Sequence, residues 1–318
     1  MAYPLGWSVI PQLIVRRERW QRGGDRERVV PLVQEGQEVL PDQPVLRLHS
    51  EPLDGRAQGV SSSIETADET LPAGLHGRVL SITPRGGVVL ESRAALIQGI
   101  VGAGKQVVGV ITIWQAGGAG GGSTVIPPGA ILIVPGPLNF ALLSQAARSG
   151  VTGIVASSIA LRDLEGFLRT DLLQLLDTRN IEWAHAQLPP VTLMFTEGLG
   201  TAAMSASALN LLNRYQGSIG LLSGLTSVQQ GIFPELVISL GLEEAQKHWQ
   251  PIVPDARLVV GSQVRIRGGA HASTTGTIDY FFVYEQRFPS GICARAVRVR
   301  REDGSLSTVP LALLERIG

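Results

Sequence analysis

The stretch from residue 130 to residue 159 constrains the fold most, because it contains a complete strand, helix, strand unit. The run Ile131 to Val134 is short, apolar and β-branched, and Pro135-Gly136-Pro137 ends it, as expected for a strand buried on both faces. Apolar residues at helical spacing follow, and Gly150 supplies a helix stop. Residues 152–156 then predict a second buried strand. Two parallel strands joined by a helix form a right-handed crossover, so we expect a parallel sheet.

Composition narrows the class of protein. At 318 residues the chain is too long for one typical core and suits two or three domains. Its 27 basic and 27 acidic residues balance, which gives no overall attraction to nucleic acid or acidic membranes. The single Cys293 excludes an intramolecular disulfide and a cysteine-based metal cage. Neither a secretory signal nor a run of about 20 apolar residues is found, so we expect a cytoplasmic protein without a membrane span.

Residues 1–95 alternate short apolar runs with turns and lack helical periodicity, which predicts a β domain. Within it, Glu35-Gly36 is followed by Val39, and a later segment reads Gly77-Arg-Val79. These features resemble the barrel-sandwich hybrid of biotinyl and lipoyl carrier domains. That family attaches its cofactor to a hairpin lysine, whereas residues 1–104 contain no lysine. We therefore expect the bare scaffold without covalent biotin or lipoate, which also occurs as a docking or adaptor module.

The central region, residues 96–254, is expected to be an α/β domain with a short parallel sheet and a Gly-rich loop at residues 116–123. The segment from Gly99 to Gln106 matches a phosphate-binding P-loop in its glycines and in Lys105. Gln106, however, stands where Ser or Thr should ligate magnesium, and a strand-like run follows instead of a helix. We therefore favour a β-hairpin turn over a nucleotide site.

Three strand-to-helix junctions are expected at one edge of this sheet. Leucines at helical spacing from Leu161 to Leu176 predict a helix, Val191 to Phe195 a third strand, and Thr201 to Leu212 another helix. Open parallel sheets bind ligands outside the carboxyl ends of their strands, although glycine and serine also serve there as turns and helix caps. The candidate ligand-binding residues are Gly136, Asn139, Ser157, Ser158, Thr196, Glu197 and Gly198.

The pattern becomes all-β at Leu258, which predicts a third domain at residues 255–318. Residues 297–315 supply a later hairpin and a closing strand, and residues 281–291 form a long insertion. The segment resembles the KOW motif of ribosomal proteins and NusG-type transcription elongation factors, a small SH3-like barrel. The residues that carry this resemblance are Val264, Ile266, Gly268, Gly276 and Ile278.

The KOW resemblance implies binding to RNA, the ribosome or RNA polymerase. Residues 257–318 hold nine basic and five acidic residues, so their net charge is +4. This excess supports only weak phosphate binding, and protein docking is an equal alternative. Phe281, Phe282 and Tyr284 lie nearby for stacking. The candidate nucleic-acid or partner-binding residues are Arg265, Arg267, Arg295, Arg298, Arg300 and Arg301.

Catalytic and metal-binding patterns are absent from the sequence. The five histidines lack metal-ligand spacing, and neither a G-x-S-x-G elbow nor a pair of carboxylates suggests catalysis. His185 would act in phosphoryl transfer only in a phosphohistidine domain, and no glycine signature accompanies it. A sole carboxylate, Glu197, cannot form a metal site. We therefore expect no catalytic residue, no cofactor and no metal.

Two interpretations remain for this multidomain α+β chain. The leading one is a non-catalytic adaptor that docks on a larger assembly of protein or RNA through its KOW-like domain. It predicts that Arg265, Arg267, Arg298 and Arg300 form one exposed patch. The alternative is a small-ligand-binding protein or enzyme, with a pocket that gathers Asn139, Ser157 and Glu197 at the junctions. The sequence does not set the oligomeric state.

Overall fold

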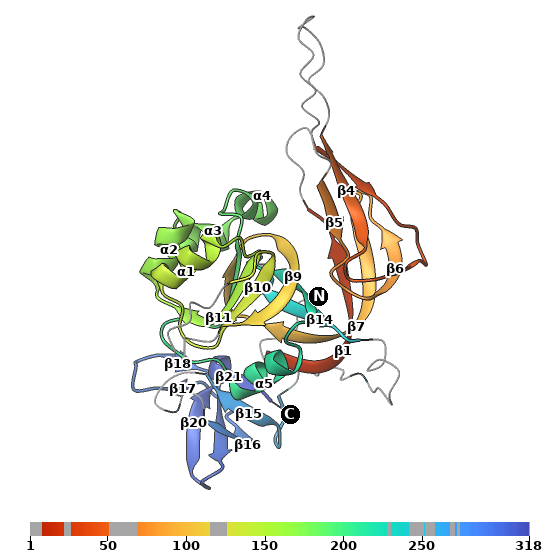
Figure 1. The fold of residues 1–318 in the computed structure, drawn as a ribbon. Helices are drawn as coiled ribbons and strands as arrows, with labels where there is room; N and C mark the ends of the chain where they lie inside the picture. The colour runs from red at the N-terminus through yellow and green to blue at the C-terminus, as the bar shows by residue number, and fades with distance from the viewer. Residues whose placement is uncertain are drawn as a thin grey trace, which may run out of the picture.

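The architecture is taken from a computed structural model and is rich in β-strands (Figure 1). Eleven strands form a curled mixed sheet with the path order β3-β6-β7-β14-β13-β9-β10-β11-β12-β8, and β1 pairs with β7 beside this path. Within the described ranges, no helix is both long and apolar enough to cross a membrane. The structure describes residues 8–21, 27–50, 69–114, 126–227, 230–241, 251, 258–267, 271 and 274–317.

Two long antiparallel strands, β1 (Val9–Arg19) and β7 (Val88–Gln98), connect the N-terminal and central parts of the molecule. The first half of β7 pairs with β6 (Gly77–Ile82), and the second half pairs with β14 (Glu235–Ser239). The domain boundary expected at residue 95 therefore lies inside a continuous strand. Alternate β1 and β7 side chains are buried in a core that both parts share.

The N-terminal part contains a second, three-stranded antiparallel sheet of β2 (Glu27–Pro31), β4 (Pro44–Ser50) and β5 (Glu69–Pro72). The short β3 (Glu38–Val39) pairs with β6. A Cβ at Gly77 would lie 2.0 Å from the Glu91 carbonyl oxygen, so only glycine permits this close pairing of β6 with β7. The core between the two layers includes Val39, Val45, Leu46, Leu71, Val79 and Leu90.

The central part has four parallel strands in the order β9, β10, β11, β12. Helix α1 (Phe140–Arg148) joins β10 to β11, which confirms the predicted strand, helix, strand unit. Both β10 and β11 are buried along their whole length, as a parallel strand covered on two faces requires. The strand bounds are β8 (Val101–Ala103), β9 (Gln106–Ile113), β10 (Ala130–Val134), β11 (Gly153–Ile159), β12 (Thr192–Leu199) and β13 (Ile219–Ser223).

A strand follows Lys105, as expected, but the connection at Gly104 and Lys105 is not the predicted hairpin. β8 pairs with β12, whereas β9 pairs with β10 and β13, so the two strands are not hydrogen-bonded to each other. The curl of the sheet accounts for the difference, because it brings the β12 edge back toward the start of β9. The Gly-rich loop expected at residues 116–123 and the expected turn at Gly268 lie outside the described residues.

Helices cover both faces of the parallel strands. Helix α1 and the short helices α2 to α4 pack over one face, where Leu132 and Val134 are buried. Helix α5 (Ala206–Arg214) packs over the other, where Ile131 and Ile133 are buried. The alternation of side chains along one strand thus supplies two separate cores.

Two helix predictions need correction. The single helix expected from Leu161 to Leu176 is divided into α2 (Leu161–Leu168) and α3 (Leu172–Asp177), and α4 (Ile181–Ala186) follows. Arg169 adopts the left-handed region at φ 56°, and the Asp171 side chain caps α3 by accepting from the amides of Leu173 and Gln174. The helix expected at residue 201 begins at Ala206, because the Ser205 hydroxyl caps it at that point.

The C-terminal part is a separate five-stranded antiparallel sheet in the order β20-β19-β16-β15-β21. A short hairpin of β17 (Gln286–Arg287) and β18 (Cys293–Ala294) interrupts it. The sheet has its own small core and lies beside α5 in Figure 1. Its strands are β15 (Gln263–Ile266), β16 (Thr275–Phe281), β19 (Ala296–Arg301), β20 (Leu306–Pro310) and β21 (Leu314–Arg316).

Candidate functional site

The three strand-to-helix junctions lie at one edge, because β10, β11 and β12 are adjacent and parallel. At the first junction, Gly136 precedes Asn139, which is the N-cap of α1. The exposed Asn139 side chain accepts a hydrogen bond from the Leu142 amide at 2.8 Å. This satisfies one of the free amides at the helix start, so the structure gives Asn139 a local structural role.

Replacing Asn139 with alanine is expected to lower the free energy of unfolding by about 1 kcal/mol, because the Leu142 amide loses its acceptor. Urea unfolding measures the change. Asn139→Asp, which keeps the accepting oxygen, is the control and should retain most of the stability. Equal loss in both variants would contradict the capping role.

At the second and third junctions, the hydroxyl groups differ in their contacts. Ser158 donates to the Ala202 carbonyl at 2.8 Å and so ties β11 to the chain before α5. Ser157 and Thr196 lie on neighbouring strands, and their hydroxyl oxygens are buried without a hydrogen-bond partner in the described part of the chain. Gly198 adopts φ +81°, which glycine tolerates best, and it continues β12 past this point.

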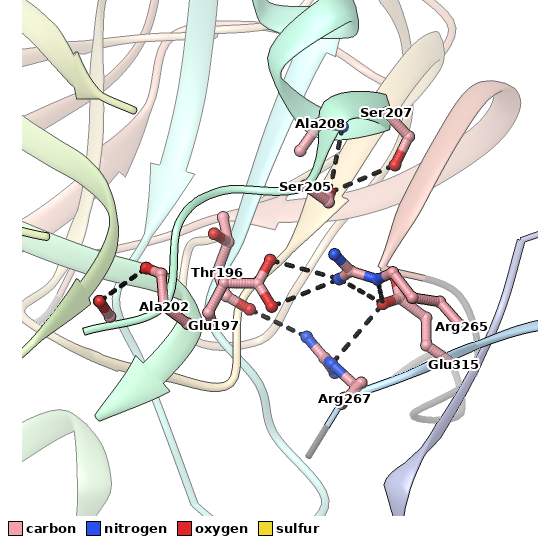
Figure 2. A network of polar contacts seen from close by, with 10 residues as sticks. Thr196, Glu197, Ala202, Ser205, Ser207, Ala208, Arg265, Arg267 and Glu315 are labelled. Carbon is pink, nitrogen blue, oxygen red and sulfur yellow. Dashed lines mark hydrogen bonds and ion pairs between the residues drawn. The ribbon is translucent and has the colours of Figure 1, made fainter. Parts of the chain in front are cut away.

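Glu197 points away from the sheet edge into a group of charged residues from the C-terminal part (Figure 2). Both of its carboxylate oxygens lie 3.3 Å from Nη2 of Arg265 on β15. The same guanidinium donates to Glu315 of β21, at 2.6 Å from Nη2 and 2.9 Å from Nε. Arg267 donates from Nη2 to the Thr196 carbonyl at 2.9 Å, and its Nε lies 3.6 Å from Glu315.

We call Glu197, Arg265, Arg267 and Glu315 the Arg265 cluster. Their side chains are between 3% and 12% exposed, so water screens them little. Burial alone would lower the pKa of Arg265, but the carboxylates of Glu315 and Glu197 outweigh it and raise that pKa above the ordinary value. Two carboxylates and two guanidiniums thus neutralise one another between β12, β15 and β21.

The cluster brings together residues that the sequence assigned to two different sites. Glu197 came from the ligand-binding set, and Arg265 and Arg267 came from the basic set. Sequence reasoning missed their partner Glu315, whose signal was an acidic residue within the otherwise apolar closing strand. Arg265 and Arg267 therefore face the central sheet, and they do not share an exposed patch with Arg298 and Arg300.

The other basic candidates lie on the outside of the C-terminal sheet. Arg298 and Arg300 both bind Asp279, at 2.6 Å and 3.1 Å. Hydrogen bonds from Arg300 and Arg298 lower the pKa of the Asp279 carboxyl below its usual value. Arg301 lies 3.6 Å from Asp303, and Arg295 is exposed. Most of the positive charge is thus matched by neighbouring acids.

Several apolar side chains are exposed within and directly beside the insertion that the sequence placed at residues 281–291. Val283 and Tyr284 are each 81% exposed, and Ile292 is 62% exposed. Next to them the rings of Tyr280 and Phe282 meet edge to face with centroids 5.3 Å apart. We call these five residues the 280–292 group.

The described cavities lie away from the junctions. One of about 1180 Å³ lies among α1 to α4, one of about 400 Å³ lies beside α4 and β9, and one of about 340 Å³ lies between α5 and β21. The seven junction candidates line none of these three. The part of the chain that the structure describes contains no group of three or more His, Cys, Asp or Glu residues placed to hold a metal ion.

The 400 Å³ cavity contains a residue that the sequence analysis set aside. His185 is 2% exposed, and its Nδ1 lies 2.9 Å from the Gly104 amide nitrogen. Its Nε2 is buried and makes no hydrogen bond to the described residues. Burial lowers the pKa of His185 to about 4, which keeps the ring neutral at pH 7. Lys105 of the rejected P-loop lines the same cavity.

Comparison with models of known protein families gives no match, and comparison with curated protein sequences gives none either.

Proposed function

We propose that this protein is a non-catalytic adaptor that docks on a protein partner through the 280–292 group of its C-terminal, KOW-like SH3 barrel. The observation that carries the proposal is the exposure of Val283 and Tyr284 in the short insertion and of Ile292 directly after it. Exposed apolar and aromatic side chains of this kind are typical of the centre of protein interfaces, where tyrosine is a frequent anchor.

The distribution of charge favours a protein partner over RNA. Binding to a phosphate backbone needs cations that are free to replace counterions. Arg298 and Arg300 are already paired with Asp279, and Arg265 is already paired with Glu315. Arg287 and Arg295 are exposed and have no ion-pair partner among the described residues. Two free arginines next to apolar side chains suit a partner surface that is apolar in the centre and acidic at its rim.

Support for an adaptor role also comes from the way the C-terminal sheet is held. The Arg265 cluster fixes β15 and β21 against β12, so the 280–292 group is presented from a defined position. In the N-terminal part, the turn at Gly36 and the pairing of Gly77 in β6 fit the barrel-sandwich scaffold that the sequence resembles. That scaffold, without a lysine for biotin or lipoate, would provide a second docking module, and the central α/β part would join the two.

The test compares variants of the full chain in affinity capture from the source cell, with and without ribonuclease and at two salt concentrations. Tyr284→Ala combined with Ile292→Ser should weaken binding of the captured protein by about tenfold or more. Leu306→Ser is the matched control, because Leu306 is 51% exposed on β20 outside the insertion. Direct titration of the purified partner with each variant measures the affinity.

The proposal holds if one protein binds directly, resists ribonuclease, binds the control variant and is lost with the double variant. Recovery that ribonuclease abolishes, and that Arg295→Ala weakens more than the double variant does, would show an RNA partner and overturn it. Capture of no specific protein by the intact chain would overturn it as well.

A further inference from the structure

The 400 Å³ cavity beside α4 has an unusual lining. Its volume lies within the range of about 300–1,000 Å³ that is typical of small-ligand sites. Two of the five tryptophans of the chain, Trp20 and Trp183, line it together with three glutamates and three glutamines. Lys105, Arg85 and His185 complete its polar lining. The lining thus offers acceptors on the glutamates, donors on Lys105, Arg85 and the tryptophans, and groups of both kinds on the glutamines and on His185.

Two polar groups in this lining, Nε2 of His185 and the ammonium group of Lys105, have no partner in the described chain. Nδ1 of His185 lies 2.9 Å from the Gly104 amide nitrogen and 3.2 Å from the Gly104 carbonyl oxygen, so it accepts from the first or donates to the second, and Nε2 of the neutral ring is then a donor or an acceptor respectively. That buried Nε2 is unpartnered, and a buried polar group without a partner indicates a missing water or ligand. Lys105 follows Gly104 directly, and its carbonyl is held by Thr192 at 2.8 Å. The ammonium group of Lys105 makes no ion pair within the described residues.

The charges of the lining exclude a simple anion or cation as the best occupant. Arg85 binds Glu18 at 2.6 Å and Glu182 at 2.9 Å, which leaves this trio with a net charge of −1. Glu69 adds a further negative charge and Lys105 a positive one. The total of −1 disfavours an anion, while the ammonium group of Lys105 disfavours a cation. A neutral molecule that offers many acceptors and donors satisfies both conditions.

The tryptophans supply the apolar part of the same site. Trp183 on α4 is 51% exposed and lines both this cavity and the larger cavity among α1 to α4. The guanidinium of Arg85 lies 4.1 Å from the centroid of the Trp20 ring and so occupies one face of it. An aromatic face beside ordered polar side chains suits a ring that carries C–H groups on its faces and hydroxyl groups around its edge.

We propose that the cavity lined by Trp20, Trp183, Lys105 and His185 is a binding site for a neutral sugar of one or two rings. The sugar hydroxyls would hydrogen-bond to His185 Nε2, accept from Lys105 and donate to the carboxylates of Glu69 and Glu182. A ring face would pack on Trp183. This cavity shares no residue with the 280–292 group. The sugar-binding proposal can therefore be correct if the docking proposal is wrong, and the docking proposal can be correct if the sugar-binding proposal is wrong.

The test is a titration of the full chain with glucose, galactose, mannose, N-acetylglucosamine, maltose and cellobiose. Intrinsic fluorescence reports on the five tryptophans of the chain, of which Trp20 and Trp183 line the cavity, and saturation-transfer NMR identifies the sugar protons that contact the protein. Inorganic phosphate, acetate and choline are titrated in the same way as charged test compounds. We expect at least one sugar to bind with a Kd of about 1 mM or tighter, as a shallow polar site allows.

Variants locate the site. Trp183→Ala and Lys105→Met should each weaken sugar binding about tenfold or more. Leu173→Ala, a 75% exposed residue on the neighbouring helix α3, is the control and should bind as the parent does. Circular dichroism and thermal unfolding confirm that each variant is folded.

Saturable sugar binding that falls in Trp183→Ala and Lys105→Met, but not in Leu173→Ala, supports the site. Three results overturn it: no sugar in the panel binding with a Kd below about 10 mM, binding of the charged compounds alone, or sugar binding that both cavity variants retain.

Discussion

Replacing Arg265 with methionine is expected to lower the free energy of unfolding by about 3–5 kcal/mol. The substitution keeps much of the side-chain volume but removes the positive charge between Glu197 and Glu315, whose side chains are 9% and 3% exposed. Arg267 alone would then face two buried carboxylates, and an uncompensated buried charge is far more costly than the loss of an ion pair in solvent. Urea unfolding followed by circular dichroism measures the change.

The control for this prediction is Arg298→Met. Arg298 also binds an acid at 2.6 Å, but its side chain is 42% exposed, so solvent screens the pair with Asp279. Surface ion pairs contribute about 0–1 kcal/mol to stability. The free energy of unfolding of the control should therefore be close to that of the parent protein. The double variant Arg265→Met with Glu315→Leu removes charges of both signs and should recover part of the loss. Equal destabilisation by Arg265→Met and Arg298→Met would contradict the importance of burial.

Local sequence signals predicted the elements that are determined by interactions between residues close together in the chain. The strand, helix, strand unit at residues 130–159 was correct, because an apolar β-branched run, a proline stop and a glycine after the helix act within a few residues. The division between α2 and α3 was missed, although Asp171 is a preferred N-cap residue. Leucine periodicity continued across the break and concealed it.

Long-range pairings could not be read from the sequence. Arg265 meets partners 50 and 68 residues away in the chain, and His185 meets Gly104 at a separation of 81. The docking interpretation placed Arg265 and Arg267, which alternate with Val264 and Ile266, in an exposed patch. The structure covers both faces of β15, one with the small C-terminal core and the other with the central sheet. Alternation alone does not show whether the polar face of a strand is exposed to solvent or packed against another part of the protein.

The surroundings of the candidate site residues also depend on parts of the chain that are distant in sequence. The residues chosen at the junctions lie after β10 or in the last residues of β11 and β12, which extend past the predicted strand ends, and Asn139 and Ser158 make contacts within the chain. The 400 Å³ cavity was missed, because its lining comes from β1, β5, β9 and α4, which are distant in sequence. Lys105 and His185 were each weighed alone, and only the fold brings them together.

Acidification from pH 6.5 to pH 4 is expected to remove about 3 kcal/mol of stability through His185. Burial lowers the pKa of its ring from 6.5 in the unfolded chain to about 4 in the folded one. Above pH 6.5 the ring is neutral in both states and contributes no pH dependence. Between pH 6.5 and 4 only the unfolded state binds the proton, so unfolding becomes more favourable as pH falls. Urea unfolding at half-unit pH steps measures this slope.

His185→Gln separates this contribution from those of the carboxylates, because it removes the titrating ring. The variant should be less stable than the parent at pH 7 yet lose much less stability between pH 6.5 and pH 4.5. Glu18 acts in a lower window: hydrogen bonding from Arg85 lowers the pKa of its carboxyl below 4.5, so its contribution is present above 4.5 and is lost as pH falls further. Glu18→Gln should therefore leave the slope above pH 4.5 unchanged. An unaltered slope in His185→Gln would show that His185 is not the group that opposes protonation, and would place the buried neutral ring in doubt.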